Sequence, residues 1–231
     1  MEVYNFHFFC PLLNIMNHIS FIDCFFETPV HTCVNDFILR TKELSTYHMV
    51  SKYGFQSLYE EANPRAYVIL GSASHVNQRL DWHLELAKFI DTKLRQNIPV
   101  LGICFGHQLM ADFYGSKVDY IDETQVTRKE PRKLTIDSPF YGIPKDESFT
   151  LAYCHSQVIK ELSDQFTSIA HSDDFENEII KHNTLPFIGL QAHPEASKNF
   201  LANEAKVDEK LLLKTKNDGD RFLDYFISAL K

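Results

Sequence analysis

A cysteine between two glycines, where an apolar run meets a helix-like run, constrains the fold of this chain more than any other feature. The segment Gly102-Ile103-Cys104-Phe105-Gly106-His107-Gln108 follows the apolar residues 99–101, and residues 108–114 have helical spacing. Glycines two positions before and after the cysteine give room for a tight strand-to-helix turn. The first N–H groups of the helix would favour a thiolate and later an oxyanion. The pattern predicts a nucleophile elbow built around a thiol, against the alternative of an inert buried cysteine.

A second motif lies far downstream, where the apolar residues 185–190 run toward a histidine and a glutamate. A thiol nucleophile needs a base, and the base needs a third group that fixes its tautomer and orientation. His193 and Glu195 supply both residue types, two positions apart. Taken alone, this motif is more typical of a strand-end histidine beside a surface glutamate. The two motifs together predict a Cys104–His193–Glu195 triad that the fold would have to assemble.

These motifs, Gly-Ile-Cys-Phe-Gly-His-Gln and His-Pro-Glu, resemble those of the class I glutamine amidotransferase family, the triad glutaminases, over roughly residues 18–195. The resemblance implies that Cys104 attacks the side-chain amide carbon of glutamine and that His193 passes a proton to the departing ammonia. It also implies that Glu195 orients His193 while water hydrolyses the thioester. The chain is therefore predicted to be an enzyme that releases glutamate and ammonia from L-glutamine without a cofactor or a metal.

The resemblance further assigns candidate substrate-binding residues. Gln108 stands where the family has a glutamine that contacts the substrate. The segment His155-Ser156-Gln157 resembles one whose backbone holds the amino-acid end of glutamine. Ser156 and Gln157 are accordingly predicted to bind substrate, although without the family Gln108 would be an ordinary helix residue and this segment a polar turn.

The oxyanion hole is where the sequence departs from the family pattern. The resemblance assigns its two N–H donors to Phe105 and to Ala73, which stands where a glycine is expected in the loop 71–75. Alanine tolerates left-handed backbone angles poorly, so the hole is expected to form differently or after a partner binds. We therefore predict low basal activity, because losing one such donor typically costs about 3 kcal/mol of transition-state stabilisation.

Strand-like and helix-like segments alternate along the chain. Residues 18–23, 47–51 and 67–70 are predicted strands, and residues 32–41 and 222–230 are predicted helices. Residues 81–97 form the most persuasive amphipathic helix, with Asp81 as a candidate N-cap and an apolar face made by Trp82, Leu86, Phe89, Ile90 and Leu94. The alternation predicts an α/β fold of the flavodoxin-like type, a mostly parallel sheet with helices on both faces.

Two stretches break this alternation. Residues 117–178 contain several half-exposed strand patterns, which predict a small antiparallel excursion from the main sheet. Residues 198–220 are polar, and we interpret them as a solvated helix face or a mobile loop, with a lid or partner contact as the alternative. Residues 1–15 precede a candidate start at Met16, so we expect an N-terminal extension followed by one domain over residues 16–231.

Composition narrows the function classes. The net charge of −8 and the lack of a basic run give no support for a nucleic-acid or anionic-membrane partner. Five cysteines without a Cys-x-x-Cys pair argue against a disulfide framework or a structural zinc site and fit a reducing cytoplasm. Residues 4–26 are apolar, but they lack the basic start of a signal peptide and are interrupted before they reach the length of a membrane span.

Two other functions remain open from the sequence. A γ-glutamyl hydrolase or peptidase would use the same triad on larger γ-glutamyl compounds and would need no acceptor for ammonia. A catalytically silent regulatory subunit would keep the fold without the reaction. We expect no synthetase domain within this sequence, so an amidotransferase would require a separate synthetase subunit that receives the ammonia. We expect L-glutamine or a γ-glutamyl compound as substrate in each enzymatic case.

Overall fold

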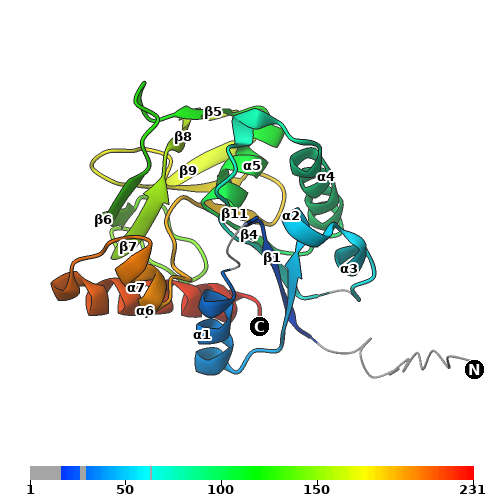
Figure 1. Cartoon of the computed structure of the whole chain (residues 1–231), viewed down its shortest axis with the longest axis horizontal. Helices are drawn as coiled ribbons and strands as arrows, with labels where there is room; N and C mark the ends of the chain where they lie inside the picture. Colours follow the sequence, from blue (N-terminus) through cyan, green and yellow to red (C-terminus); the bar gives the residue numbers. More distant parts are fainter. Residues whose placement is uncertain (1–16, 27–29, 63) are drawn as a thin grey trace, which may run out of the picture.

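The computed structural model describes residues 17–26, 30–62 and 64–231, and within them nine strands form one large sheet (Figure 1). Half of this sheet is parallel, in the order β2-β1-β3-β4-β11. Its strands are β1 (Ile19–Asp23), β2 (Ser45–Met49), β3 (Ala66–Ile69), β4 (Val100–Ile103) and β11 (Phe187–Leu190). This is the flavodoxin-like order, in which ligands bind beyond the carboxyl ends of the strands. The predicted α/β fold is confirmed.

The other half of the sheet is antiparallel and continues from β11 in the order β10-β9-β6-β7. Its strands are β6 (Arg128–Ile136), β7 (Ser148–His155), β9 (Phe166–His171) and β10 (Ile179–His182). A separate two-stranded sheet is formed by β5 (Lys117–Tyr120) and β8 (Gln157–Glu161). The antiparallel part is therefore larger than the predicted excursion, because β10 pairs along β11 and joins its neighbours to the main sheet.

Helices cover both faces of the sheet (Figure 1). They are α1 (His31–Thr41), α2 (Val50–Tyr53), α3 (Gln56–Tyr59), α4 (Asp81–Arg95), α5 (Phe105–Phe113), α6 (Lys198–Asn203) and α7 (Glu209–Ala229), with a 3-10 turn η2 (Val76–Gln78). Alternate strand residues point to opposite faces. Phe21 of β1 thus packs with α1 and α7, whereas its neighbour Ile22 packs with α4 and α5. The two apolar layers hold the ends of β4 and β11 rigidly side by side.

Two local predictions differ from the structure, and a third is resolved by it. The second strand ends at Met49, and Val50 already begins α2, which turns the chain at Gly54 with φ +75°. The N-cap of α4 is Leu80, so Asp81 is the first helical residue, where its charge still favours the positive helix end. The polar stretch 198–220 lies in α6 and α7, joined by a short turn, in agreement with the helical alternative of its two interpretations.

Other sequence predictions concern membrane spans, metal sites, the state of the cysteines and the N-terminal segment. Within residues 17–26, 30–62 and 64–231, no helix is long and apolar enough to cross a membrane. In the same ranges, no three His, Cys, Asp or Glu side chains are grouped so that they could hold a metal ion. The cysteines at 24, 33, 104 and 154 are free thiols. The candidate start at Met16 and the extension over residues 1–15 lie outside the described residues.

Candidate active site

The turn at Cys104 joins a buried strand directly to a helix. Strand β4 ends at Ile103, α5 begins at Phe105, and Cys104 between them has φ +50° and ψ −98°. A non-glycine residue with such a backbone costs about 1–3 kcal/mol and persists where the surrounding structure enforces it. The flanking glycines are required by close approach: a β-carbon on Gly102 would lie 2.8 Å from the carbonyl carbon of Gly106. The strand-to-helix elbow predicted from the sequence is present.

The Cys104 thiol is buried between the end of the sheet and strand β7. Its Sγ lies 3.8 Å from the carbonyl oxygen of Cys154, and its side chain is nearly inaccessible to solvent. The Cys104 N–H donates to the carbonyl of Leu190 at 2.8 Å, which ties the elbow to the end of β11. The first N–H groups of α5 have no acceptor within the helix and carry its positive dipole end. The sulfur therefore lies beside N–H groups that stabilise negative charge.

Immediately after β11, His193 and Glu195 form a buried pair. The Nδ1 of His193 lies 2.8 Å from Oε1 of Glu195, and neither side chain is more than 5% exposed. The His193 N–H donates to the carbonyl of Ala152 at 2.9 Å, which fixes the backbone of the pair against β7. The opposite ring nitrogen, Nε2, is buried, and besides Glu195 the His193 ring has a side-chain interaction with the Cys104 thiol. The geometry leaves this nitrogen available to a neighbouring thiol or a reacting group.

The ionisation of His193 reflects its neighbours. Burial alone lowers the pKa of this imidazole, but the negative charges of Glu195 and Cys104 outweigh burial and hold the pKa well above its usual value. A second buried thiol nearby behaves differently: burial and the charge of Glu195 raise the pKa of Cys33 to about 11. The site therefore favours a cationic His193 between two acidic groups, while Cys33 remains a protonated thiol at neutral pH.

Gly71, directly after the end of β3, connects the two motifs in space. A β-carbon on Gly71 would lie 3.0 Å from Cε1 of His193 and 3.8 Å from Cβ of Cys104. The loop after β3 therefore lies against both residues at the carboxyl edge of the parallel strands. The structure thus brings together the thiol, the imidazole and the carboxylate, which the sequence separates widely.

The predicted oxyanion residue Ala73 lies further along this loop. Its side chain is exposed, and its backbone is not in the left-handed region. The loop is held by Ser72 Oγ, which donates to the Cys24 carbonyl at 2.7 Å, and by the Ser74 hydroxyl, which lies 2.9 Å from Nε2 of His83. Since Gly71 is the loop residue that contacts the pair, a role for the Ala73 N–H stays a prediction.

The predicted substrate-binding residues form one buried hydrogen-bonded group. The Gln108 amide nitrogen donates to the carbonyl of Gln157 at 2.7 Å and to Oε1 of Gln191 at 2.8 Å. The side-chain oxygen of Gln157 accepts the N–H of Val76 at 3.0 Å, which links this group to η2. Ser156 is buried beside them, and its carbonyl accepts the N–H of Ile121 at 2.8 Å. Helix α5, the β7–β8 connection and the end of β11 therefore meet at Gln108.

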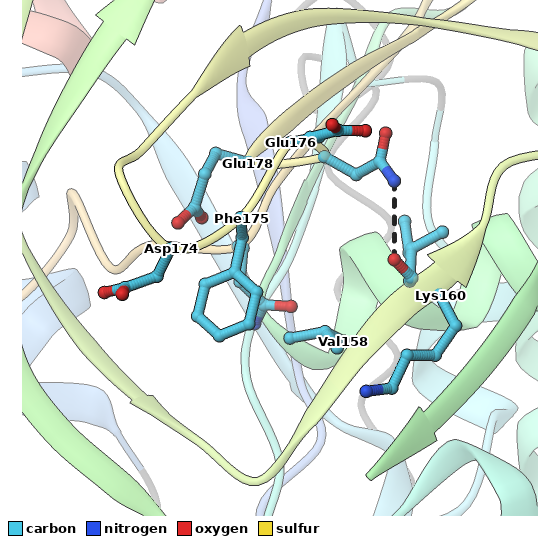
Figure 2. Close-up of a pocket in the computed structure, with 9 residues that line it drawn as sticks. Val158, Lys160, Asp174, Phe175, Glu176 and Glu178 are labelled. Carbon is cyan, nitrogen blue, oxygen red and sulfur yellow. Dashed lines mark hydrogen bonds between the residues drawn. The ribbon is translucent and has the colours of Figure 1, made fainter. Parts of the chain in front are cut away.

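Sequence analysis missed three buried polar residues near this group: Gln191, Arg132 and Glu178. For Gln191, the sequence feature that could have identified it is its position two residues before His193. A cavity of about 280 Å³ adjoins Gln191 between β8 and the loop 172–178 (Figure 2). In this view Phe175 lies between Val158 of β8 and Glu178. The cavity lies next to the glutamine group, and neither Cys104 nor His193 lines it.

Known proteins resemble both the sequence and the fold. The family model for class I glutamine amidotransferases matches residues 33–205. One subunit of the glutamine-hydrolysing GMP synthase of Methanopyrus kandleri is 38% identical over 104 residues, 45% of this chain and 54% of that protein. The corresponding Pyrococcus abyssi protein is 36% identical over 116 residues, 48% and 61% of the two chains. This chain thus spans little more than half the length of the curated relatives that it matches.

Solved structures extend the likeness of fold over nearly the whole chain. A glutamine amidotransferase from Thermotoga maritima has a TM-score of 0.68 at 20% identity, covering 93% of this chain and 96% of its own. One from Methylobacillus flagellatus has a TM-score of 0.69 at 16% identity, covering 94% and 96%. At these identities the structures support the fold, and the family model supports the family. The chain belongs to the class I glutamine amidotransferase family.

Proposed function

We propose that this chain hydrolyses the side-chain amide of L-glutamine to glutamate and ammonia through a thioester on Cys104. The observation that carries the proposal is the buried His193–Glu195 hydrogen bond of 2.8 Å, held beside the elbow thiol by the loop at Gly71. A nucleophile, a base and an orienting carboxylate in one buried site constitute the machinery of acyl transfer. No other chemistry is needed for amide hydrolysis.

The reaction proceeds in two halves. The thiol proton passes to Nε2 of His193, and the thiolate attacks the amide carbon and converts the carbonyl oxygen to an oxyanion. Collapse of this intermediate breaks the C–N bond, and the His193 proton goes to the leaving nitrogen, which departs as ammonia. His193 then takes a proton from water, which attacks the thioester and regenerates the thiol. Glu195 stabilises the imidazolium form in both halves, in agreement with the raised pKa of His193.

The surrounding residues have supporting roles in this proposal. The N–H of Phe105 at the start of α5 is one oxyanion donor, and the loop carrying Ala73 supplies the second. Gln108, Ser156 and Gln157 bind the amino-acid end of glutamine. Because Ala73 stands where the family has a glycine, we expect the second donor to be completed only when a partner binds. Basal turnover is therefore low.

The ammonia has a separate acceptor in this proposal. The curated relatives are named as one subunit of a glutamine-hydrolysing GMP synthase, a name that itself describes one part of an assembly. We infer that this chain likewise delivers ammonia to a synthetase subunit. The residues described here account for the release of ammonia, and the synthetase subunit would supply the molecule that accepts it.

Glutamate release from L-glutamine by the wild-type chain, measured beside the Cys104→Ala variant, tests the proposal. We expect slow release by the wild type and none by the variant. Release that persists in Cys104→Ala would exclude the thioester route. Turnover of γ-glutamyl peptides in preference to L-glutamine, again dependent on Cys104, would instead identify a γ-glutamyl hydrolase. Turnover of neither class of compound would point to a silent regulatory subunit.

A further inference from the structure

Arg132 of β6 is a buried cation behind the glutamine group. Its guanidinium stacks on the ring of Tyr153 at 3.8 Å and lies 4.8 Å from the ring of Phe175. Its Nη2 lies 2.7 Å from Nε2 of His155 and 3.5 Å from Oε1 of the fully buried Glu178. Burying a charge is costly unless it is paired and hydrogen-bonded. Strands β6 and β7 and the loop 172–178 thus converge on one arginine that the triad itself does not contact.

Arg132 fixes the tautomer of His155. A guanidinium has N–H donors and no acceptor, so Nε2 of His155 must accept this hydrogen bond and carry no proton. Burial, together with the positive charge of Arg132, lowers the pKa of His155 to about 3, so the ring is neutral at physiological pH. Its single proton is therefore on Nδ1, which lies 2.9 Å from the carbonyl oxygen of Gln157. His155 donates to that carbonyl and holds it in place.

The Gln157 carbonyl determines which way the side-chain amide of Gln108 is oriented. The oxygen of Gln157 accepts from His155 and also from the amide nitrogen of Gln108, which donates in addition to Gln191. Both hydrogens of the Gln108 amide are therefore used. Its side-chain oxygen is the group that remains for a ligand. Since the Gln157 carbonyl can only accept, rotating the Gln108 amide by half a turn would place two oxygens against each other.

We propose that Arg132 and His155 are positioning residues that hold the Gln108 amide with its oxygen toward the substrate, so that the site selects amides carrying a hydrogen-bond donor on the α-carbon. The inference rests on the proposed amide hydrolysis at Cys104. An outward oxygen accepts from an α-ammonium group, and hydrogen bonds to charged groups are worth about twice as much as neutral ones. Arg132 acts through His155 and does not touch the substrate.

The test compares L-glutamine with glutaric acid monoamide, which has the same reacting amide and carboxylate but lacks the α-amino group. The wild type is expected to prefer L-glutamine in kcat/KM. In Arg132→Met and His155→Leu this preference falls about 10-fold, through a higher KM for L-glutamine with kcat changed by less than about 3-fold. His155→Asn places an N–H donor at the position of Nδ1 and is expected to retain most of the preference.

Controls separate this effect from damage to the fold. Arg221→Met removes another arginine that stacks on a phenylalanine, Phe149 at 4.2 Å, and pairs with Glu147 at 2.7 Å, away from His155. It is expected to leave the substrate preference unchanged. The rate at which iodoacetamide alkylates Cys104 reports on the elbow without involving an α-amino group. If Arg132→Met does not fold, the contrast between His155→Leu and His155→Asn decides the inference.

The outcomes are distinguishable. A wild-type chain that releases no glutamate from L-glutamine overturns the proposed function and with it this inference. A wild type that does release glutamate, together with variants that keep the full preference for L-glutamine, overturns the positioning role alone. Equal losses of preference in His155→Leu and His155→Asn would also contradict it, because the donor at Nδ1 would then be irrelevant.

Discussion

Gly71 and His193 approach so closely that the imidazole leaves no room for a side chain on the glycine: a β-carbon at Gly71 would lie 3.0 Å from Cε1 of the ring. The backbone of Gly71 is not in the left-handed region, so space is the constraint at this position. In Gly71→Ala, the His193 ring must shift by a few tenths of an ångström relative to Cys104. We expect kcat for glutamate release to fall by about 10- to 100-fold, since small misplacements of catalytic groups are costly.

Thermal unfolding of the same variant provides the comparison. The substitution adds one methyl group at the end of a strand, so the midpoint should change by only a few degrees, about 1 kcal/mol. Unchanged turnover in Gly71→Ala would show that the loop yields instead of the imidazole. It would also argue against the role of this loop in setting the oxyanion donor.

The His193–Glu195 pair predicts a change in protonation. The carboxylate raises the pKa of His193 against the lowering effect of burial. In Glu195→Gln the negative charge is lost while the size is kept, so the pKa of His193 is expected to fall. Titration of the His193 ring by NMR should show this downward shift. A pKa that stays as high as in the wild type would assign the shift to the thiolate of Cys104 alone.

Turnover in Glu195→Gln should also fall, by about 10³- to 10⁴-fold, as for replacement of the orienting carboxylate in other triads. The amide can hold His193 through its oxygen, but it does not stabilise the imidazolium. The matched control is Glu204→Gln, another glutamate in the segment that follows the triad, which makes no hydrogen bond to His193. It should leave both the titration and the turnover near wild type.

The elbow glycines predict a loss of stability. A β-carbon on Gly106 would lie 2.7 Å from Cβ and 2.8 Å from the carbonyl oxygen of Ile69, a residue of the buried strand β3. Backbone cannot move aside cheaply, so Gly106→Ala should lower the free energy of unfolding by about 1–3 kcal/mol. Urea denaturation measures this change. Gly115→Asn is the comparison: nothing lies within 4 Å of a β-carbon there, so its cost reports only the strain of a side chain at φ +90° without steric overlap.

The elbow could be predicted because contiguous residues encode it, and the mostly parallel character of the sheet could be predicted from the alternation of strand and helix patterns. Gly102, Cys104 and Gly106 specify a tight turn within five positions, and the strands on either side are short apolar runs. The family was likewise evident from two local motifs. The pairing of β10 with β11 could not be read in the same way, because alternation identifies a strand without identifying its neighbour. The antiparallel half of the sheet was therefore underestimated.

Arg132 and Glu178 illustrate the second limit. In the sequence, Arg132 lies among the mostly charged residues 128–133 and resembles an exposed strand position. Its burial depends on the rings of Tyr153 and Phe175, which are contributed by β7 and by the loop 172–178. A charge pair between residues that are far apart in the sequence produces no spacing pattern from which it could be predicted. The role of Gln108 was inferred from the family, whereas the direction of its amide required the hydrogen bonds of Gln157 and His155.

The start of α6 predicts a link between helix capping and the triad. The hydroxyl of Ser197 accepts the N–H of Phe200 at 3.2 Å, and the ring of Phe200 packs against His193 with centroids 5.2 Å apart. Ser197→Ala removes the cap and should cost about 1 kcal/mol of stability. Because the loosened turn lies two residues after Glu195, we expect kcat to fall as well, by up to about 10-fold.

Asp208 caps the next helix in the same way and provides the matched control. Its carboxylate accepts the N–H of Lys210 at 2.8 Å at the exposed start of α7. Asp208→Ala should cost a similar free energy of unfolding, about 1 kcal/mol, while leaving kcat unchanged. Denaturation curves and glutamate release measured on both variants separate the two effects. Equal losses of activity would show that global stability limits turnover, whereas a loss confined to Ser197→Ala would show that α6 holds the His193 ring in place through Phe200.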